Sequence, residues 1–264
     1  MRFHLYTTDV SGFALLRQLP EGERVSAVVV PANRATSDKV KLVCRESPWP
    51  VVVHHAKDGL PEETPKADYF VSWFYSQIIS RQLLATYAKG GINMHGGRIP
   101  DYRGANVLNW AIANGETHLG VTWHEVVEKV DAGGILAESS IPVATGKAAI
   151  DLRTDIINEG VRLFPEAMQR FVSGGPPLRV PDLNCGRIWP SRRAEDSRIE
   201  PRWSIDRVDA MIRAQTGPWP DATVFDNGEW RSIVGFSSDP VPDGIPYQTD
   251  RGQEIYLVPK SGPS

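Results

Sequence analysis

The first half of the chain alternates short apolar runs with helix-like patterns, and this alternation limits the possible folds more than any other feature. The apolar runs predict strands at Phe3–Thr7, Val25–Pro31, Val51–His54, Tyr69–Tyr75 and Gly91–His95. The segments between them predict helices at Gly12–Leu19, Asp38–Glu46 and Ser80–Tyr87, the last with Ser80 as its N-cap. Strands that alternate with helices are typical of an open, mostly parallel sheet with helices on its faces. The fold class predicted for this half is therefore α/β.

The second half begins with a segment, residues 96–104, whose glycines and proline predict a loop. It is followed by a predicted helix at Ala105–Asn114, strands at Leu119–Val127 and Ile135–Val143, and a long helix at Ala148–Phe171. Short β-like pieces then appear at Cys185–Trp189, Ala222–Phe225, Glu229–Val234 and Glu254–Val258, with one helix at Ser204–Ala214. We therefore expect a domain over residues 1–178 and a small β-barrel or sandwich over residues 179–264.

Composition narrows the class of protein further. The chain has 264 residues and a formal net charge of −3, so no global basic field favours nucleic acid. Its two cysteines, Cys44 and Cys185, lie far apart without metal-ligand spacing around them, so neither a disulfide framework nor a zinc site is indicated. The first residues are too polar for a signal peptide, and no apolar run is long enough to span a membrane. We expect a cytoplasmic protein without membrane segments.

The strongest candidate for a reactive site combines Asn93 and His95 with Asp131. The two-residue period of a strand places Asn93 and His95 on one face, with Met94 turned into the core. Asp131 precedes a Gly-Gly pair, a turn that can return a carboxylate to the strand end and keep the imidazole charged. An amide donor, an imidazole and a carboxylate can act together on a carbonyl group. Each residue alone has an ordinary structural role, so their combination carries the prediction.

The residues around these three resemble a known family. Asn93–Gly104, with Asn114–Thr117, Leu119–Thr122 and Val130–Gly134, is similar to the catalytic core of the folate-dependent formyltransferases. These include methionyl-tRNA, glycinamide ribonucleotide and amino-sugar N-formyltransferases. Glu195–Ile199 and Arg213–Ala222 are similar to the C-terminal domain of the tRNA enzymes and some sugar enzymes. The resemblance implies a Rossmann-like, mostly parallel sheet with flanking helices and a small C-terminal β-barrel-like domain.

The resemblance also implies an activity, the transfer of a formyl group from 10-formyltetrahydrofolate to a primary amine without a metal. Asn93 and protonated His95 would donate hydrogen bonds to the oxyanion that develops on the formyl group. Asp131 would orient the imidazole and help accept the proton that the amine loses. Taken together, these roles predict an enzyme, a one-carbon group transferase.

Residues that bind cofactor and substrate are also implied. The folate would contact Trp73, Phe74, Tyr75, Ile78, Glu128, Lys129 and Val130. Alternating aromatic residues are equally typical of a buried strand, so a core role for residues 73–75 stays open. The substrate would contact Arg98, Tyr102 and Arg103, although charged loop residues usually face solvent. The histidines at 54, 55, 118 and 124 have no carboxylate or cysteine at ligand spacing, so no metal site is predicted.

The acceptor amine is the least determined feature. Many family members have a serine and leucines after the histidine, whereas this chain has Gly97, Arg98 and Ile99. The acidic balance and the lack of a dense basic patch near the C-terminus argue against tRNA. Residues 73–75, 109–110 and 114–117 look more like the sugar enzymes, including the one that formylates UDP-4-amino-4-deoxy-arabinose, so we expect a nucleotide-linked amino sugar.

Alternatives to this acceptor are hydroxyornithine destined for a siderophore and methionyl-tRNA. A non-catalytic folate-binding or regulatory protein is an alternative of another class. The presence of Asn93, His95 and Asp131 together argues against that alternative, because a protein that only binds folate need not keep all three. The C-terminal domain could pair subunits in a homodimer or cap the site, and both possibilities stay open.

Overall fold

A computed structural model describes residues 1–32, 35–55, 58–217 and 219–260. Its main feature is a seven-stranded sheet of order β3-β2-β1-β4-β5-β7-β8. The strands are β1 (Arg2–Thr7), β2 (Arg24–Pro31), β3 (Val51–His54), β4 (Tyr69–Trp73), β5 (Gly91–His95), β7 (His118–Glu125) and β8 (Ile135–Pro142). The pairs from β3 to β5 are parallel, and β7 runs antiparallel to β5. The predicted α/β class with a mostly parallel sheet is confirmed.

Helices cover both faces of this sheet, because side chains of successive strand residues point to opposite faces. On one face, α1 (Ala35–Cys44) packs its Val40 and Cys44 against Val28 and Val30 of β2. On the other face, α2 (Arg81–Ala85) places Leu83 in a cluster with residues of β1, β2 and β4. Ser80 caps α2 as predicted, since its side chain accepts a hydrogen bond from the Leu83 backbone N–H.

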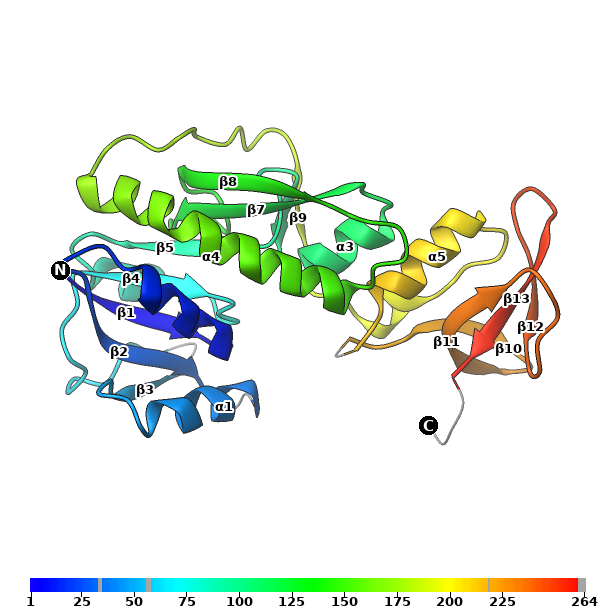
Figure 1. Cartoon of the computed structure of the whole chain (residues 1–264), viewed down its shortest axis with the longest axis horizontal. Coiled ribbons are helices and arrows are strands. Elements are labelled where there is room, and N and C mark those ends of the chain that lie inside the picture. Colours follow the sequence, from blue (N-terminus) through cyan, green and yellow to red (C-terminus); the bar gives the residue numbers. More distant parts are fainter. Residues whose placement is uncertain (33–34, 56–57, 218, 261–264) are drawn as a thin grey trace. The chain divides into compact units, whose positions relative to one another are not determined.

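The long helix α4 (Ala149–Ser173) runs past β7 and β8 (Figure 1). The Trp123 indole N–H of β7 donates to the Gly160 carbonyl at 2.8 Å, and its ring packs against that of Phe164. The Arg170 side chain donates to the Leu136 carbonyl of β8. These contacts bury the face of β7 opposite to its polar residues.

The structure differs from the sequence predictions at three places. The segment predicted as helix at 12–19 is a 3-10 helix, η1 (Val10–Gln18), whose tight i→i+3 turn lets Gly12 approach Thr7 and Trp73. The predicted loop 96–104 contains a short strand, β6 (Tyr102–Gly104), which pairs with β9 (Arg187–Trp189). Strand β12 (Ile245–Gln248) was not predicted, because Pro246 within it weakens the strand pattern.

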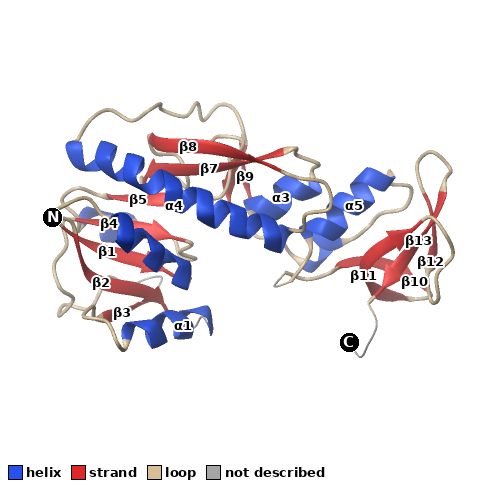
Figure 2. Ribbon diagram, in the orientation of Figure 1, coloured by secondary structure: helices blue, strands red, loops and turns tan. Residues whose placement is uncertain are grey.

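The C-terminal residues form a four-stranded antiparallel sheet of order β10-β11-β13-β12. Its other strands are β10 (Ala222–Asp226), β11 (Glu229–Ser237) and β13 (Glu254–Pro259), preceded by the short 3-10 helix η2 (Ala194–Ser197). Helix α5 (Ile205–Ala214) lies beside this sheet (Figure 2), is capped by the Ser204 side chain, and packs Val208 and Ile212 against the sheet. Helix α3 (Val107–Ala113) contacts α5, with the Asn109 amide donating to the Ala214 carbonyl.

Contacts divide the chain into two compact units. The first comprises residues 1–103, 120–140 and 156–187, and the second comprises residues 104–119, 141–155 and 188–264. The predicted domain boundary between residues 178 and 179 stays a prediction. None of the helices in the described ranges is long and apolar enough to cross a lipid bilayer.

Candidate active site

The site is built on β5, whose bounds are those predicted from sequence. Met94 is 3% exposed and turned into the core, so Asn93 and His95 share the other face of the strand. The first residue of the strand is Gly91, which packs so closely against the Phe70 ring that a Cβ there would lie 2.4 Å from it. The strand therefore enters the sheet at a position that only glycine fits, and ends with His95 buried at its carboxyl end.

Asp131 reaches this strand through the turn between β7 and β8. Its own backbone has a φ of 46°, in the left-handed region that aspartate tolerates better than most residues. Gly133 lies so close to β7 that a Cβ would be 1.9 Å from the Glu125 carbonyl oxygen. This close approach folds the turn back, and the Asp131 Oδ2 lies 3.6 Å from the His95 Nδ1. The structure thus brings the three predicted catalytic residues into one cluster.

His95 is held at both ring nitrogens. Its Nε2 lies 2.5 Å from the Tyr102 carbonyl oxygen, while its Nδ1 faces Asp131. The carbonyl oxygen can only accept, so Nε2 carries the N–H group that donates to it. The ring is 7% exposed and has little freedom to turn. Donation from His95 to a substrate oxyanion, as predicted from sequence, would therefore require exchange of the hydrogen bond to Tyr102.

His124 belongs to the same cluster, although sequence reasoning set it aside. It lies on β7 directly opposite Asn93 and is 2% exposed. Its Nε2 lies 3.1 Å from the Asn93 Nδ2 and 3.4 Å from the Asp131 Oδ1. Only the antiparallel register of β5 and β7 identifies His124 as part of the site. The apolar pattern of the sequence does not reveal which strands are neighbours, so it could not provide this register.

Trp73 does not offer a surface to a cofactor, contrary to the prediction. Its side chain is 0% exposed and packs against the Trp123 ring at 5.8 Å between centroids. Its indole N–H donates to the Ser11 hydroxyl at 2.9 Å. Strand β4 lies in a sheet that is covered on both faces, so its aromatic side chains lie in the core. Trp73 therefore has the core role that the sequence left open.

The other predicted folate residues lie in two segments of the first unit. Tyr75 is half-buried, with its hydroxyl 2.5 Å from the His54 Nδ1, while Ile78 is 72% exposed. Tyr75 and Val126 pack against the same buried cluster, so the segment after β4 and the segment after β7 both border it. The remaining predicted residues are Phe74, with a φ of 47° and partly buried, and the exposed Glu128, Lys129 and Val130.

The three predicted substrate residues differ in accessibility. The Arg98 side chain is 58% exposed, and its Nε donates to the Asp101 Oδ2 at 2.7 Å. Tyr102 and Arg103 are 7% and 8% exposed. Arg98 is therefore the predicted substrate residue with a side chain open to solvent, whereas Tyr102 acts on the site through its backbone carbonyl.

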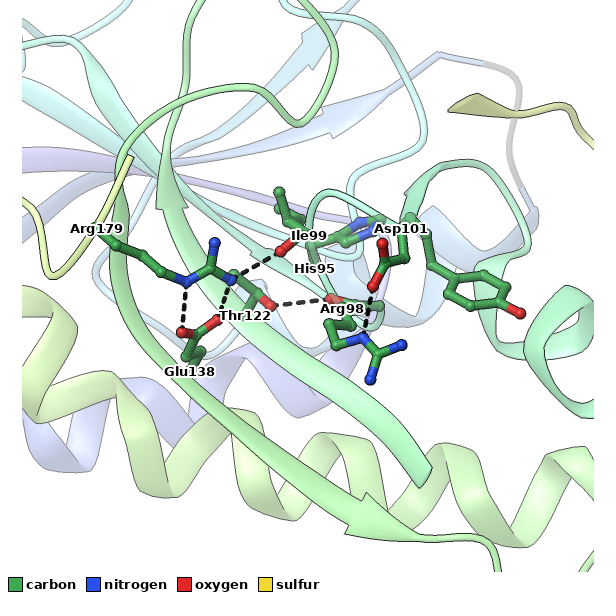
Figure 3. Close-up of polar contacts among 9 residues, drawn as sticks. His95, Arg98, Ile99, Asp101, Thr122, Glu138 and Arg179 are labelled. Carbon is green, nitrogen blue, oxygen red and sulfur yellow. Dashed lines mark hydrogen bonds and ion pairs between the residues drawn. The ribbon is translucent and has the colours of Figure 1, made fainter. Parts of the chain in front are cut away.

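The loop that carries these residues is braced from β7 and β8 (Figure 3). The Arg179 guanidinium forms a bidentate pair with Glu138, at 2.7 and 2.5 Å, and also donates to the Ile99 carbonyl. The hydrogen bonds that Arg179 donates to Glu138 raise the pKa of the guanidinium, so it stays charged. The Thr122 hydroxyl donates to the Gly97 carbonyl at 2.9 Å. Two side chains thus fix the backbone that follows His95.

The electrostatic composition of the cluster is one carboxylate between two imidazoles. Each oxygen of Asp131 faces a different histidine, and the carboxylate is 11% exposed. Within the described ranges, no group of three or more His, Cys, Asp or Glu side chains is arranged to hold a metal ion. The arrangement offers an amide donor, a carboxylate that can take a proton, and two imidazole rings that face the oxygens of this carboxylate.

Comparison with known proteins identifies the class. The sequence profile described as "Formyl transferase" matches residues 31–168, just over half of the 264-residue chain. The chain belongs to the formyl transferase family, and it is accordingly an enzyme of the formyltransferase class. The predicted family is thereby confirmed.

Solved structures share the fold at low sequence identity. The N-formyltransferase from Helicobacter canadensis, in complex with folinic acid and dTDP-3-aminofucose, has a TM-score of 0.72 and 15% identity over 98% of this chain and 99% of its own. A sugar N-formyltransferase from a Shewanella species has a TM-score of 0.71 and 16% identity over 88% and 96%.

HypX from Aquifex aeolicus shares the fold too. Its complex with tetrahydrofolic acid has a TM-score of 0.63 and 21% identity over 88% of this chain, which spans 43% of the length of HypX. The chain therefore spans less than half of HypX but nearly the whole of the sugar enzymes.

Proposed function

We propose that this enzyme transfers the formyl group of 10-formyltetrahydrofolate to the primary amine of a nucleotide-linked amino sugar. The observation that carries the proposal is the buried cluster of Asn93, His95 and Asp131, with the His95 Nδ1 and the Asp131 Oδ2 3.6 Å apart. Membership of the formyl transferase family supports the same chemistry.

The donor fits the residues present. The segments after β4 and β7 border one buried cluster through Tyr75 and Val126, and they carry the exposed apolar side chains of Ile78 and Val130. Apolar side chains of this kind are suited to a planar, partly apolar ring system. When bound, 10-formyltetrahydrofolate supplies a formyl group on nitrogen that an amine can take over. The complexes of HypX with tetrahydrofolic acid and of the Helicobacter canadensis enzyme with folinic acid support a folate donor.

In the proposed reaction each polar residue has one task. The Asn93 amide donates a hydrogen bond to the formyl oxygen as negative charge develops there. Asp131 accepts the proton that the attacking amine loses, directly or through one water molecule, and this proton is returned to the folate nitrogen as its bond to the formyl carbon breaks and tetrahydrofolate departs. His95 is held by its Nε2 on the Tyr102 carbonyl and turns its Nδ1 toward Asp131, and so fixes the orientation of that carboxylate.

Two observations support the choice of acceptor: the similarity of nearly the whole chain to an enzyme with a bound nucleotide-linked amino sugar, and the exposure of Arg98. The chain matches the Helicobacter canadensis enzyme over 98% of its length, and that structure contains dTDP-3-aminofucose. Arg98 presents an exposed guanidinium beside the loop that follows His95, which suits an anionic acceptor such as a nucleotide diphosphate. Hydroxyornithine and methionyl-tRNA are the other acceptors to be tested.

The test is a panel of amines incubated with 10-formyltetrahydrofolate while release of tetrahydrofolate is followed. The panel contains nucleotide-linked amino sugars, hydroxyornithine and charged initiator tRNA. We expect turnover with an amino sugar. Turnover with tRNA or hydroxyornithine alone would exclude the sugar, and folate binding without turnover of any amine would favour the non-catalytic alternative.

A further inference from the structure

We infer that His124 is a positioning residue of this site, whose neutral Nδ1–H tautomer fixes the orientation of the Asn93 amide. This inference rests on the proposed function, because Asn93 matters as the donor to the formyl oxygen. His124 does not touch the reacting atoms, but acts through Asn93. The sequence pattern gave it no role.

The position of His124 is set by the sheet. In the antiparallel register of β5 and β7, Asn93 pairs with His124, so their side chains lie side by side on one face. His124 is 2% exposed, and a buried imidazole without partners would be costly. Both of its ring nitrogens have partners within 3.1 Å, which accounts for a polar residue at this position.

The backbone determines which nitrogen carries the proton. The Nδ1 of His124 lies 2.8 Å from the carbonyl oxygen of Glu125, which can only accept a hydrogen bond. Nδ1 must therefore be protonated. In the neutral ring, the lone pair then lies on Nε2.

The Asn93 amide is oriented by that lone pair. Its Nδ2 lies 3.1 Å from the His124 Nε2, and an amide nitrogen can only donate. One N–H of Asn93 is thus used by His124, and the second remains for the formyl oxygen. The carboxamide has two orientations of similar shape, and the hydrogen bond to His124 selects the one that presents an N–H group. A protonated Nε2 would lose this lone pair and turn instead to the Asp131 Oδ1 at 3.4 Å.

The Asp131 carboxylate lies between the two histidine rings. Its Oδ1 faces His124 and its Oδ2 faces His95, so a shift of either ring moves the carboxylate. His124 therefore supports the amide donor directly. This contact with Asn93 distinguishes it from two further buried histidines of the first unit, His4 and His54, which bond to tyrosine hydroxyls and backbone carbonyls elsewhere.

The first test is activity in matched variants. His124→Leu removes the acceptor, whereas His124→Gln can place its side-chain oxygen near the position of Nε2. We expect His124→Leu to lower kcat by about 10- to 100-fold, as for an unsatisfied buried donor, with KM for the folate unchanged, and His124→Gln to recover much of the loss. Asn93→Ala should cost little more in the His124→Leu background than that background alone.

His4→Leu is the matched control, since His4 is a buried, hydrogen-bonded histidine of the same sheet that contacts Tyr87 and Pro65. It should lose stability but keep kcat. Equal losses of kcat in His124→Leu and His124→Gln, or wild-type kcat in both, would overturn the positioning role.

The second test does not depend on turnover. Nitrogen-15 NMR of the histidine rings in the full-length enzyme at neutral pH should show His124 with a protonated Nδ1 and a pyridine-like Nε2, and Asn93→Ala should shift the Nε2 resonance. Protonation at Nε2 would overturn the inference even if the enzyme is active. If no amine is turned over while the expected tautomer is seen, the proposed function fails but the inferred hydrogen bond stands.

Discussion

The two sheets of this protein carry different kinds of cross-strand residue pair, one polar and one aromatic. In the seven-stranded sheet, Asn93 and His124 form a cross-strand pair that is largely buried. In the four-stranded sheet, the cross-strand pair Phe225 and Trp230 is 59% and 48% exposed. Polar groups cost free energy when buried and gain little by it, so the buried pair is explained by function and not by stability. The exposed aromatic pair is free of that constraint.

The same contrast holds for tryptophan residues. Trp73 of β4 is 0% exposed and packs against Trp123, whereas Trp230 of β11 is half exposed and lies under the Arg198 guanidinium. Substitutions in the two sheets should therefore separate into effects on stability, effects on activity and near-neutral effects.

The largest expected effect is on stability, from Trp73→Ala. The change removes a fully buried indole and leaves a cavity between the sheet and α4, which should lower the free energy of unfolding by about 3–5 kcal/mol. Urea unfolding followed by circular dichroism measures it. A loss below about 1 kcal/mol would mean that the ring is not part of the core and would restore Trp73 as a candidate folate contact.

The next effect is on activity, from Asp131→Asn. The substitution keeps the shape of the side chain but removes the group that accepts the proton, so kcat should fall by about 10²- to 10⁴-fold. His95→Ala should also abolish most of the turnover. The control is Asp182→Asn, at an exposed turn that hydrogen-bonds to Asn184, which should keep wild-type kcat. Near-normal activity of Asp131→Asn would show that the cluster is not the catalytic centre.

The sequence predicted the parts of this site that depend on local pattern. The bounds of β5, the shared face of Asn93 and His95, and the return of Asp131 before the glycines all follow from strand period and turn chemistry. His124 could not be found in this way, because its place beside Asn93 depends on which strand pairs with β5 and in which direction. The burial of Trp73 is likewise decided by η1 and α4 packing over the sheet, which no local pattern specifies.

A smaller effect is expected where the loop after His95 is braced. Arg179→Met removes the bidentate pair with Glu138 and the hydrogen bond to the Ile99 carbonyl. The pair is partly exposed, so the loss of stability should be only about 1 kcal/mol. Because the loop then moves more freely, KM for the acceptor should rise more than kcat falls. The matched control is Arg162→Met, which breaks an exposed pair with Glu159 on α4 and should leave KM unchanged.

The smallest effect should come from Trp230→Ser. The ring gives up its cross-strand contact with Phe225 and its contact with Arg198 at 4.4 Å, which together are worth about 1 kcal/mol at an exposed site. The unfolding free energy should therefore change by about 1 kcal/mol or less, and kcat should not change. A large loss of kcat would contradict the contrast drawn between the sheets, because it would make the exposed aromatic pair a functional surface rather than a neutral one.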